Sequence, residues 1–198
     1  KTNGIIDFSL LSDKTENIKE DVVQTTEAFA WQWHNSEMGH NKGSKTYSKQ
    51  LFLDRYGVSE DELIEYVSNK IVYDPAIGSG RVEYIFAKYA KEIYSTDLSN
   101  AVYKAKENLD NHFNNINYFK GNLINPPFKN DSFDVVICHA ILQHTGNTFE
   151  GIKSLTNTLK EDGIIFFDVY RKAAPIRDFT DDFIRSLVSN LPPQEAWD

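Results

Sequence analysis

The sequence predicts an α/β fold in which helices cover both faces of a doubly wound, mostly parallel sheet. From residue 69 onward, β-branched and aromatic runs alternate with segments of helical period, and a glycine-containing turn follows the first run. At 198 residues the chain is long enough to bury one substantial core. Sheets of this kind bind ligands beyond the carboxyl ends of their strands, so functional residues are expected along that edge.

The composition narrows the class of protein. Hydrophobic residues make up 40% of the chain and charged residues 25%, as in ordinary globular proteins. No apolar run approaches the roughly 20 residues that span a bilayer. The single cysteine, Cys138, excludes an internal disulfide and fits a reducing, cytoplasmic setting. The net charge of −8 disfavours nucleic-acid binding, because Lys and Arg supply most of the affinity for phosphate backbones.

Residues 1–68 are expected to form an N-terminal arm and a helical lead-in that caps the following domain. The expected elements are an arm or weak strand over 1–24 and helices over 25–33, 48–57 and 59–70. Thr25 or Thr26 is the expected cap of the first helix. Ser59 followed by Glu62 has the spelling of a capping box for the third.

Residues 69–198 are expected to form the ligand-binding domain. Strands are predicted over 70–74, 92–99, 116–122, 132–140 and 163–170, and helices over 81–91, 100–111, 148–160 and 180–192. Thr180 is the expected cap of the last helix. Since five strands precede Asp198, the sheet is expected to be truncated after the fifth, and the native protein to continue further.

Two turns at the strand ends carry the functional signal. The first strand runs into Asp74-Pro75-Ala76-Ile77-Gly78-Ser79-Gly80, where glycines let the backbone approach a ligand, although a tight turn without a ligand is the simpler alternative. The second strand ends at Asp97, which is placed to accept hydrogen bonds from a ribose diol. A capping role beside Ser99 explains Asp97 equally well in isolation. A nicotinamide-dependent reductase would need a third glycine where Glu83 stands.

Together these turns resemble the class I S-adenosylmethionine-dependent methyltransferases of the small-molecule type, similar to the ubiquinone and menaquinone methyltransferases. The first motif of that family is an acid followed by x-G-x-G-x-G; Asp74, Gly78 and Gly80 match it, and Ala76 replaces the first glycine. The likeness covers roughly residues 71–169. It implies a Rossmann-like methyltransferase fold, S-adenosylmethionine as the cofactor and transfer of its methyl group.

The resemblance also implies a set of binding residues. Asp97 and Leu98 correspond to the ribose-binding end of the second strand, and Asn122 stands where the family has an acid that contacts the adenine amine. The expected cofactor-binding residues are Asp74, Ala76, Gly78, Gly80, Asp97, Leu98, Asn122, Leu123 and His139.

Asn125-Pro126-Pro127-Phe128 is spelled like the catalytic motif of amino-methylating nucleic-acid methyltransferases. In those enzymes the motif follows the fourth strand, whereas here it precedes that strand. Pro127-Phe128 and the following Asp131-Ser132-Phe133-Asp134 instead match the loop of small-molecule members. We therefore interpret the motif as a coincidence and expect Phe128 to pack beneath the start of the strand.

His139 and His144 are the candidate catalytic residues, because they follow the fourth strand on the ligand side and imidazole takes up protons near neutral pH. Packing of His139 beside the cofactor and helix capping by His144 are the structural alternatives. Further pocket candidates are Trp31, Trp33, Tyr47, Tyr170 and Arg171. A metal site at His34 and His40 is rejected because no cysteine or paired carboxylate completes it.

The sequence thus predicts a methyltransferase that transfers a methyl group to an O, N or C atom of a small molecule, without nucleic-acid, membrane or metal partners. The alternative is a non-catalytic, methyltransferase-like binding or regulatory module, which the departures at Ala76 and Asn122 favour. The acceptor and the oligomeric state are left open.

Overall fold

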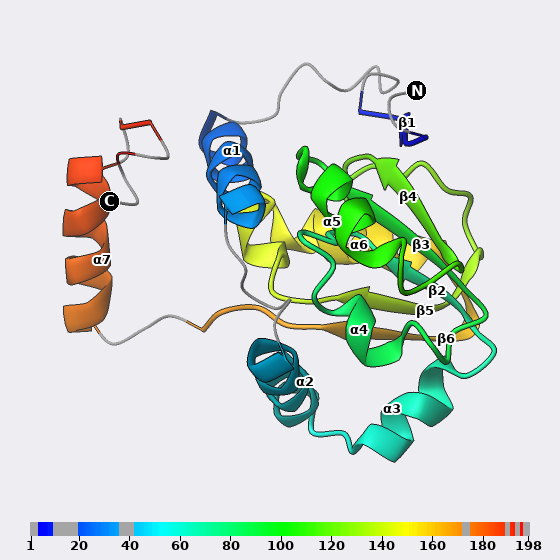
Figure 1. Cartoon of the computed structure of the whole chain (residues 1–198). Coiled ribbons are helices and arrows are strands. Elements are labelled where there is room, and N and C mark those ends of the chain that lie inside the picture. Colours follow the sequence, from blue (N-terminus) through cyan, green and yellow to red (C-terminus); the bar gives the residue numbers. More distant parts are fainter. Residues whose placement is uncertain are drawn as a thin grey trace.

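The computed structural model describes residues 4–9, 20–35, 42–171, 175–188, 191–192 and 195, and a six-stranded parallel sheet forms its centre (Figure 1). The strands are β1 (Ile6–Asp7), β2 (Ile71–Asp74), β3 (Glu92–Asp97), β4 (Ile116–Lys120), β5 (Phe133–Cys138) and β6 (Leu159–Phe167). They lie in the order β1-β4-β3-β2-β5-β6, and every neighbouring pair is parallel. The chain builds outward from β2 in both directions, which creates a ligand-binding crevice where the order switches.

The α/β class and the parallel sheet are confirmed, but the predicted count of five strands with truncation after the fifth was wrong. The sixth strand is β1, from the segment that the sequence marked only as an arm or weak strand. It pairs Ile6 with Phe119 and Asp7 with Lys120, and so covers the open edge of β4. Two paired residues are too few to show the period-2 pattern by which strands are recognised.

The two faces of the sheet carry separate layers of core, because successive strand residues point to opposite sides. On one face Val72, Val135 and Ile137 pack with α2 (Lys42–Tyr56), α3 (Glu60–Val67) and α4 (Glu83–Phe86). On the other face Tyr73 and Val136 pack with α6 (Thr148–Thr158). The first face continues into a third cluster around α5 (Ala101–Leu109), against which α1 (Glu20–Asn35) lies (Figure 1).

Helix ends were predicted well where a local motif determines them. Ser59 accepts a hydrogen bond from Glu62 N at 3.2 Å, and the Glu62 carboxylate accepts from Ser59 N at 2.7 Å, so the capping box is confirmed. Gly57 follows α2 with φ +63°, a conformation that ends helices and favours glycine.

The threonine caps were wrong. Thr26 lies inside α1, where its hydroxyl donates to Val22 O at 2.7 Å, and Thr180 lies inside α7 (Pro175–Val188), where its hydroxyl donates to Ile176 O at 2.8 Å. Thr25 also lies within α1. Hydroxyls satisfied by the preceding turn do not interrupt a helix, so a threonine alone is a weak start signal.

Helix α7 lies apart from the sheet (Figure 1). It carries five exposed apolar side chains, which are Ile176, Phe179, Phe183, Ile184 and Leu187. Among the described helices, none combines the length and hydropathy that a membrane crossing requires.

Candidate functional site

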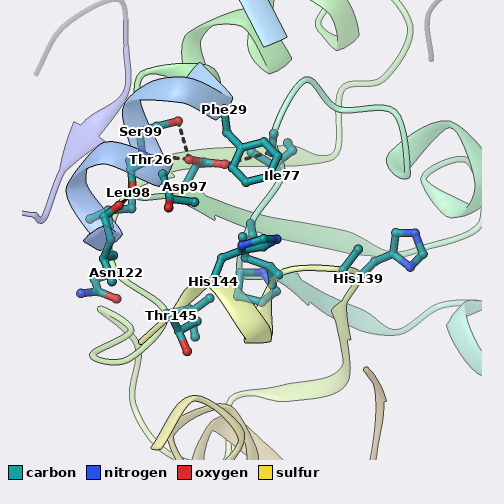
Figure 2. Close-up of a pocket in the computed structure, with 18 of the residues that line it drawn as sticks. Thr26, Phe29, Ile77, Asp97, Leu98, Ser99, Asn122, His139, His144 and Thr145 are labelled. Carbon is teal, nitrogen blue, oxygen red and sulfur yellow. Dashed lines mark hydrogen bonds between the residues drawn. The ribbon is translucent and has the colours of Figure 1, made fainter. Parts of the chain in front are cut away.

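A cavity of about 570 Å³ opens at the carboxyl edge of the sheet, where the strand order switches (Figure 2). Its floor is the turn after β2 and the ends of β3, β4 and β5; helix α1 and the short helix η2 (Leu142–His144) form its walls. Most of the predicted cofactor residues line it: Ala76, Gly78, Asp97, Leu98, Asn122, Leu123 and His139. Parallel strands end at one edge, so residues far apart in the sequence meet there.

The turn after β2 needs its glycines. Gly78 and Gly80 adopt φ of +55° and +85°, a region that disfavours other residues. A Cβ on Gly80 would lie 2.5 Å from Leu109 Cδ1, so this glycine lets α5 approach the turn and does not itself line the cavity. Ala76 does not adopt a positive φ, so an alanine fits where the family motif has glycine.

Asp97 makes the contact with Ser99 that was one of its two predicted roles, and it also lines the cavity. Its Oδ1 accepts from Ser99 N at 2.8 Å and Ser99 Oγ at 2.7 Å, which shapes the turn into α5. Its Oδ2 accepts from Gly78 N at 2.9 Å and so ties β3 to the glycine turn (Figure 2). Burial raises the pKa of the carboxyl group, although these hydrogen bonds oppose that effect. Three of the roughly four acceptor sites of the carboxylate are thus used, and the remaining one is on Oδ2.

The loop after β4 forms the wall next to Leu98. Asn122 Oδ1 accepts from Ile124 N at 3.0 Å, and Ser154 Oγ of α6 donates to Leu123 O at 2.8 Å, so both residues are held in place. Phe128 packs as predicted, with its ring 5.0 Å from that of Tyr73 and 5.1 Å from that of Phe133. Phe128 is half-buried against these rings and does not line the cavity, so it is not placed to stack on a base bound there.

Asp74 does not line the cavity. It is 4% exposed, accepts from Ala76 N at 2.8 Å, and lies beside Glu83, which is fully buried. Burial, followed by the charge of Asp74, raises the pKa of Glu83 well above its ordinary value. Two carboxylates this close cannot both be ionised in a dry site, so Glu83 holds a proton. Asp74 holds the start of the turn through its hydrogen bond with Ala76 N.

His139 is held in a network that faces α2. Its Nδ1 lies 3.1 Å from Tyr56 Oη, whose hydroxyl donates to Asp168 Oδ1 at 3.0 Å. The same Asp168 oxygen accepts from Ala140 N at 2.7 Å, and Asp168 Oδ2 accepts from Arg55 Nη1 at 2.9 Å. The ring of His139 points away from Phe29 and His144 (Figure 2). Only part of this residue therefore lines the cavity, and the ring packs on α2.

We expect His139 to stay neutral until about pH 4. Burial is the main cause that lowers its pKa from 6.5 to about 4, and the charge of Asp168 opposes that effect. Because the folded-state pKa is the lower one, neutral His139 stabilises the fold above about pH 6.5, and that contribution is lost as the pH falls toward 4. Ring NMR signals, assigned with His139→Gln, will follow the titration; a midpoint near pH 6.5 would contradict the burial described here.

His144 is the histidine whose ring faces the cavity. It lies edge-on to Phe29 at 5.1 Å between ring centres and to Tyr170 at 6.0 Å. Burial, and then the charge of Arg185 on α7, lowers its pKa, so its imidazole is neutral at pH 7. Neutral imidazole is the form that accepts a proton.

The remaining candidates divide between the cavity and the surface. Trp33 and Tyr170 line the cavity, whereas Trp31, Tyr47 and Arg171 do not. Tyr47 is 68% exposed. His40 lies outside the described residues; within them, no group of three or more potential ligands is placed to hold a metal ion.

Sequence reasoning missed four residues of this region: Arg55, Tyr56, Asp168 and Arg81. The first two lie on α2, outside the expected binding domain, and meet Asp168 only in the folded chain. Arg81 lines the cavity directly after the glycine turn. Its place after Gly80 is the one local signal that marked it.

Comparisons with known proteins agree with this geometry. Residues 73–167 match the family model described as a methyltransferase domain. The uncharacterised methyltransferase YcgJ of Bacillus subtilis (strain 168) is 24% identical over 119 residues, which cover 59% of this chain and 46% of YcgJ. The solved structure of YcgJ superimposes on this chain with a TM-score of 0.57 at 22% sequence identity. The match covers 72% of this chain and 58% of the YcgJ chain, which shows that the two share a fold.

Two further relatives also match over part of their length. The uncharacterised protein MJ1452 of Methanocaldococcus jannaschii is 33% identical over 126 residues, which cover 62% of this chain and 48% of that protein. Phosphoethanolamine N-methyltransferase 1 of Caenorhabditis elegans is 28% identical over 99 residues, which cover 49% of this chain and 21% of that protein. The chain thus spans about half the length of YcgJ and MJ1452. The narrower likeness to ubiquinone and menaquinone methyltransferases stays a prediction.

Proposed function

We propose that residues 73–167, which match the methyltransferase-domain model, form a class I S-adenosylmethionine-dependent methyltransferase domain, and that this protein transfers a methyl group from that donor to an O, N or C atom of a small molecule. One observation carries the proposal. A single cavity at the carboxyl edge of the sheet joins the glycine turn, Asp97 and the Asn122–Leu123 loop beneath α1. The arrangement provides a ribose acceptor, an apolar slot and a glycine-containing backbone turn in the order that an adenosyl ligand requires.

Each part of the donor has a proposed partner. Asp97 accepts from a ribose hydroxyl through the remaining acceptor site of Oδ2. The adenine lies between Leu98 and Leu123, and the second lone pair of Asn122 Oδ1 accepts from its amine. The amino-acid end lies along Ala76 and Gly78. Asp74, Glu83 and Gly80 do not line the cavity, and their proposed role is in the structure of that turn.

Catalysis in this site rests on positioning. The donor, when bound, supplies a methyl group on a sulfonium that is already a leaving group. The chain holds the acceptor in line and excludes water, which can account for roughly 7–11 kcal/mol of barrier reduction in well-oriented reactions. Where the acceptor carries a proton, His144 is the proposed base, because its neutral ring faces the cavity. His139, turned toward Tyr56, is proposed to position the end of β5.

The acceptor is proposed to be a small molecule. The net charge of −8, and the position of Phe128 outside the cavity lining, argue against a nucleic-acid base. The C. elegans relative is named for the methylation of phosphoethanolamine, a small amine, which is compatible with this class. The boundary between a lead-in and a binding domain at residues 68 and 69, and the cytoplasmic setting, also remain proposals.

A second candidate is a binding or regulatory module without turnover. One contact favours it: the indole of Trp33 lies over the glycine turn, with its Nε1 3.2 Å from the position of a Cβ on Gly78. An aromatic ring at this place narrows the approach to the turn. Micromolar donor binding without methylation of any compound in a panel of amines, carboxylates and phenols would support the module over the enzyme.

The first test is calorimetric titration of the protein with S-adenosylmethionine and S-adenosylhomocysteine, with NAD as the control ligand. We expect micromolar binding of both adenosyl ligands and none of NAD. Binding of NAD in preference to the adenosyl ligands would overturn the proposal. Methylation of an acceptor, followed as S-adenosylhomocysteine formation, then separates the enzyme from the module.

A further inference from the structure

Trp33 of α1 covers part of the glycine turn on the side of the cavity. A Cβ placed on Gly78 would lie 3.2 Å from Trp33 Nε1 and 3.4 Å from Trp33 Cε2. Carbon atoms that are not bonded to each other lie about 3.5–4.0 Å apart at their best separation. A ligand atom in contact with Gly78 from this direction would therefore overlap the indole. Both residues line the cavity, so the covered surface is one that a bound ligand would use.

Stacking holds the indole in this place. The Trp33 and Phe29 rings lie 6.4 Å apart, centre to centre, at an angle of 14°. The guanidinium carbon of Arg81 lies 5.1 Å from the centre of the Trp33 ring. Within the described part of the chain, Trp33 Nε1 makes no hydrogen bond. Contacts of this kind each contribute little, so the ring can leave the turn at a modest cost in free energy.

Helix α1 contributes no buried side chain to the core. From Val22 to Asn35 its side chains are half-buried or exposed, and none belongs to the core clusters of the described residues. Elements with few buried contacts open at a smaller free energy than the core does. A movement of α1, or of the Trp33 side chain alone, can thus uncover the turn while the sheet keeps its structure.

We propose that Trp33 is an occluding residue, whose indole has to leave the glycine turn before the amino-acid end of the adenosyl donor binds there. The inference rests on the proposed function, in which that end lies along Ala76 and Gly78. The ligand and the indole then compete for one surface. The measured affinity is the intrinsic affinity reduced by the fraction of molecules in which the turn is uncovered. Removing the indole should therefore strengthen donor binding, whereas removing an ordinary wall residue would weaken it.

The test compares the wild-type protein with Trp33→Ala by calorimetry. S-adenosylhomocysteine carries the amino-acid end, and methylthioadenosine lacks it. Trp31→Ala is the matched control, because it removes an indole from the same helix but outside the cavity lining. Trp33→Phe keeps a smaller ring, and it replaces Trp33→Ala if thermal unfolding shows that the alanine variant has lost its fold.

The expected result is a gain in affinity that is confined to one ligand. Trp33→Ala should bind S-adenosylhomocysteine about threefold to thirtyfold more tightly than the wild type, as expected when one stacked contact no longer competes. Its affinity for methylthioadenosine should be unchanged. Trp33→Phe should bind S-adenosylhomocysteine with an intermediate affinity, and Trp31→Ala should bind both ligands as the wild type does.

A second readout follows the indole itself. The chain has three tryptophans, so the double variant Trp31→Phe with Trp197→Phe keeps Trp33 alone. Saturation with S-adenosylhomocysteine should shift its fluorescence to longer wavelength, because the ring passes from the turn into water. A shift to shorter wavelength would show that the ring packs on the bound ligand, and the proposal would then be wrong.

The calorimetric result that overturns the proposal is a Trp33→Ala protein that binds S-adenosylhomocysteine as the wild type does, or more weakly. Trp33 is then a fixed wall of the cavity. Failure of the proposed function looks different, because neither protein then binds an adenosyl ligand. In that case hydrogen exchange at the amides of residues 76–80 in the ligand-free proteins decides. Faster exchange in Trp33→Ala supports the covering of the turn, and unchanged exchange contradicts it.

Discussion

Asp97→Ala is expected to lower the affinity for S-adenosylhomocysteine by about a hundredfold or more. A ribose hydroxyl that donates to the remaining acceptor site of Asp97 contributes about 1.5–3 kcal/mol, which alone is roughly tenfold to a hundredfold in affinity. The substitution also removes the acceptor of Gly78 N, so the glycine turn loses its link to β3. Calorimetry on the variant and the wild type measures the loss directly.

Two variants separate the ribose contact from general damage to the fold. Asp97→Asn keeps one acceptor oxygen for the turn but loses the charge, so it should bind with an intermediate affinity. Asp54→Ala removes an exposed aspartate of α2 outside the cavity and should bind as the wild type does. If Asp97→Ala binds S-adenosylhomocysteine normally, Asp97 has only the turn-forming role, and the donor placement proposed here is wrong.

Asp168→Ala is expected to lower the free energy of unfolding by about 2–4 kcal/mol. The carboxylate, 13% exposed, accepts from Ala140 N, Tyr56 Oη and Arg55 Nη1, and its loss leaves these donors without that acceptor. Ala140 has φ +58°, an unfavourable conformation for alanine that the bond to Asp168 helps to hold. Urea unfolding of the variant and the wild type gives the difference.

Tyr56→Phe is the matched control for the Asp168 network. It removes one hydroxyl but keeps the ring that packs on Phe52 and Phe166, so a loss of only about 1 kcal/mol is expected. The double variant Tyr56→Phe with Asp168→Ala should lower the free energy of unfolding by less than the sum of the two single losses, because the two residues share a hydrogen bond. An Asp168→Ala protein as stable as the wild type would show that the network does not hold α2 to the sheet.

The sequence indicated the central elements because they are marked by local chemistry. Buried β-branched runs such as Val135-Val136-Ile137 can only be strands of an enclosed sheet, and a capping box such as that of Ser59 and Glu62 defines a helix start within four residues. Strand β1 was predicted only as an arm or weak strand, because two paired residues are too few to show the alternating pattern of a strand. The predicted helix over 81–91 shrinks to α4, since buried Glu83 and the packing of Phe86 decide its extent.

The same distinction, between local sequence signals and contacts made only in the folded chain, applies to the candidate site. The acid and glycines around β2 and β3 lie within one stretch and could be predicted as a unit. The network of Tyr56, His139 and Asp168 could not, because its members are 83 and 112 residues apart and meet only when α2 docks on the strand ends. His139 was named as catalytic from its position in the chain, which does not determine the direction of its ring.

Strand β1 has a consequence for the order in which the molecule forms. It precedes every other described element in the chain, yet its partner is β4, so Ile6 meets Phe119 across all the helices and strands between them. Closing so long a loop is entropically costly and slow. As the chain leaves the ribosome, the segment that emerges before the others has to wait for β4, and β2, β3 and β4 can assemble without it. The edge of the sheet is therefore closed from the amino-terminal side, after the strand that it protects has been made.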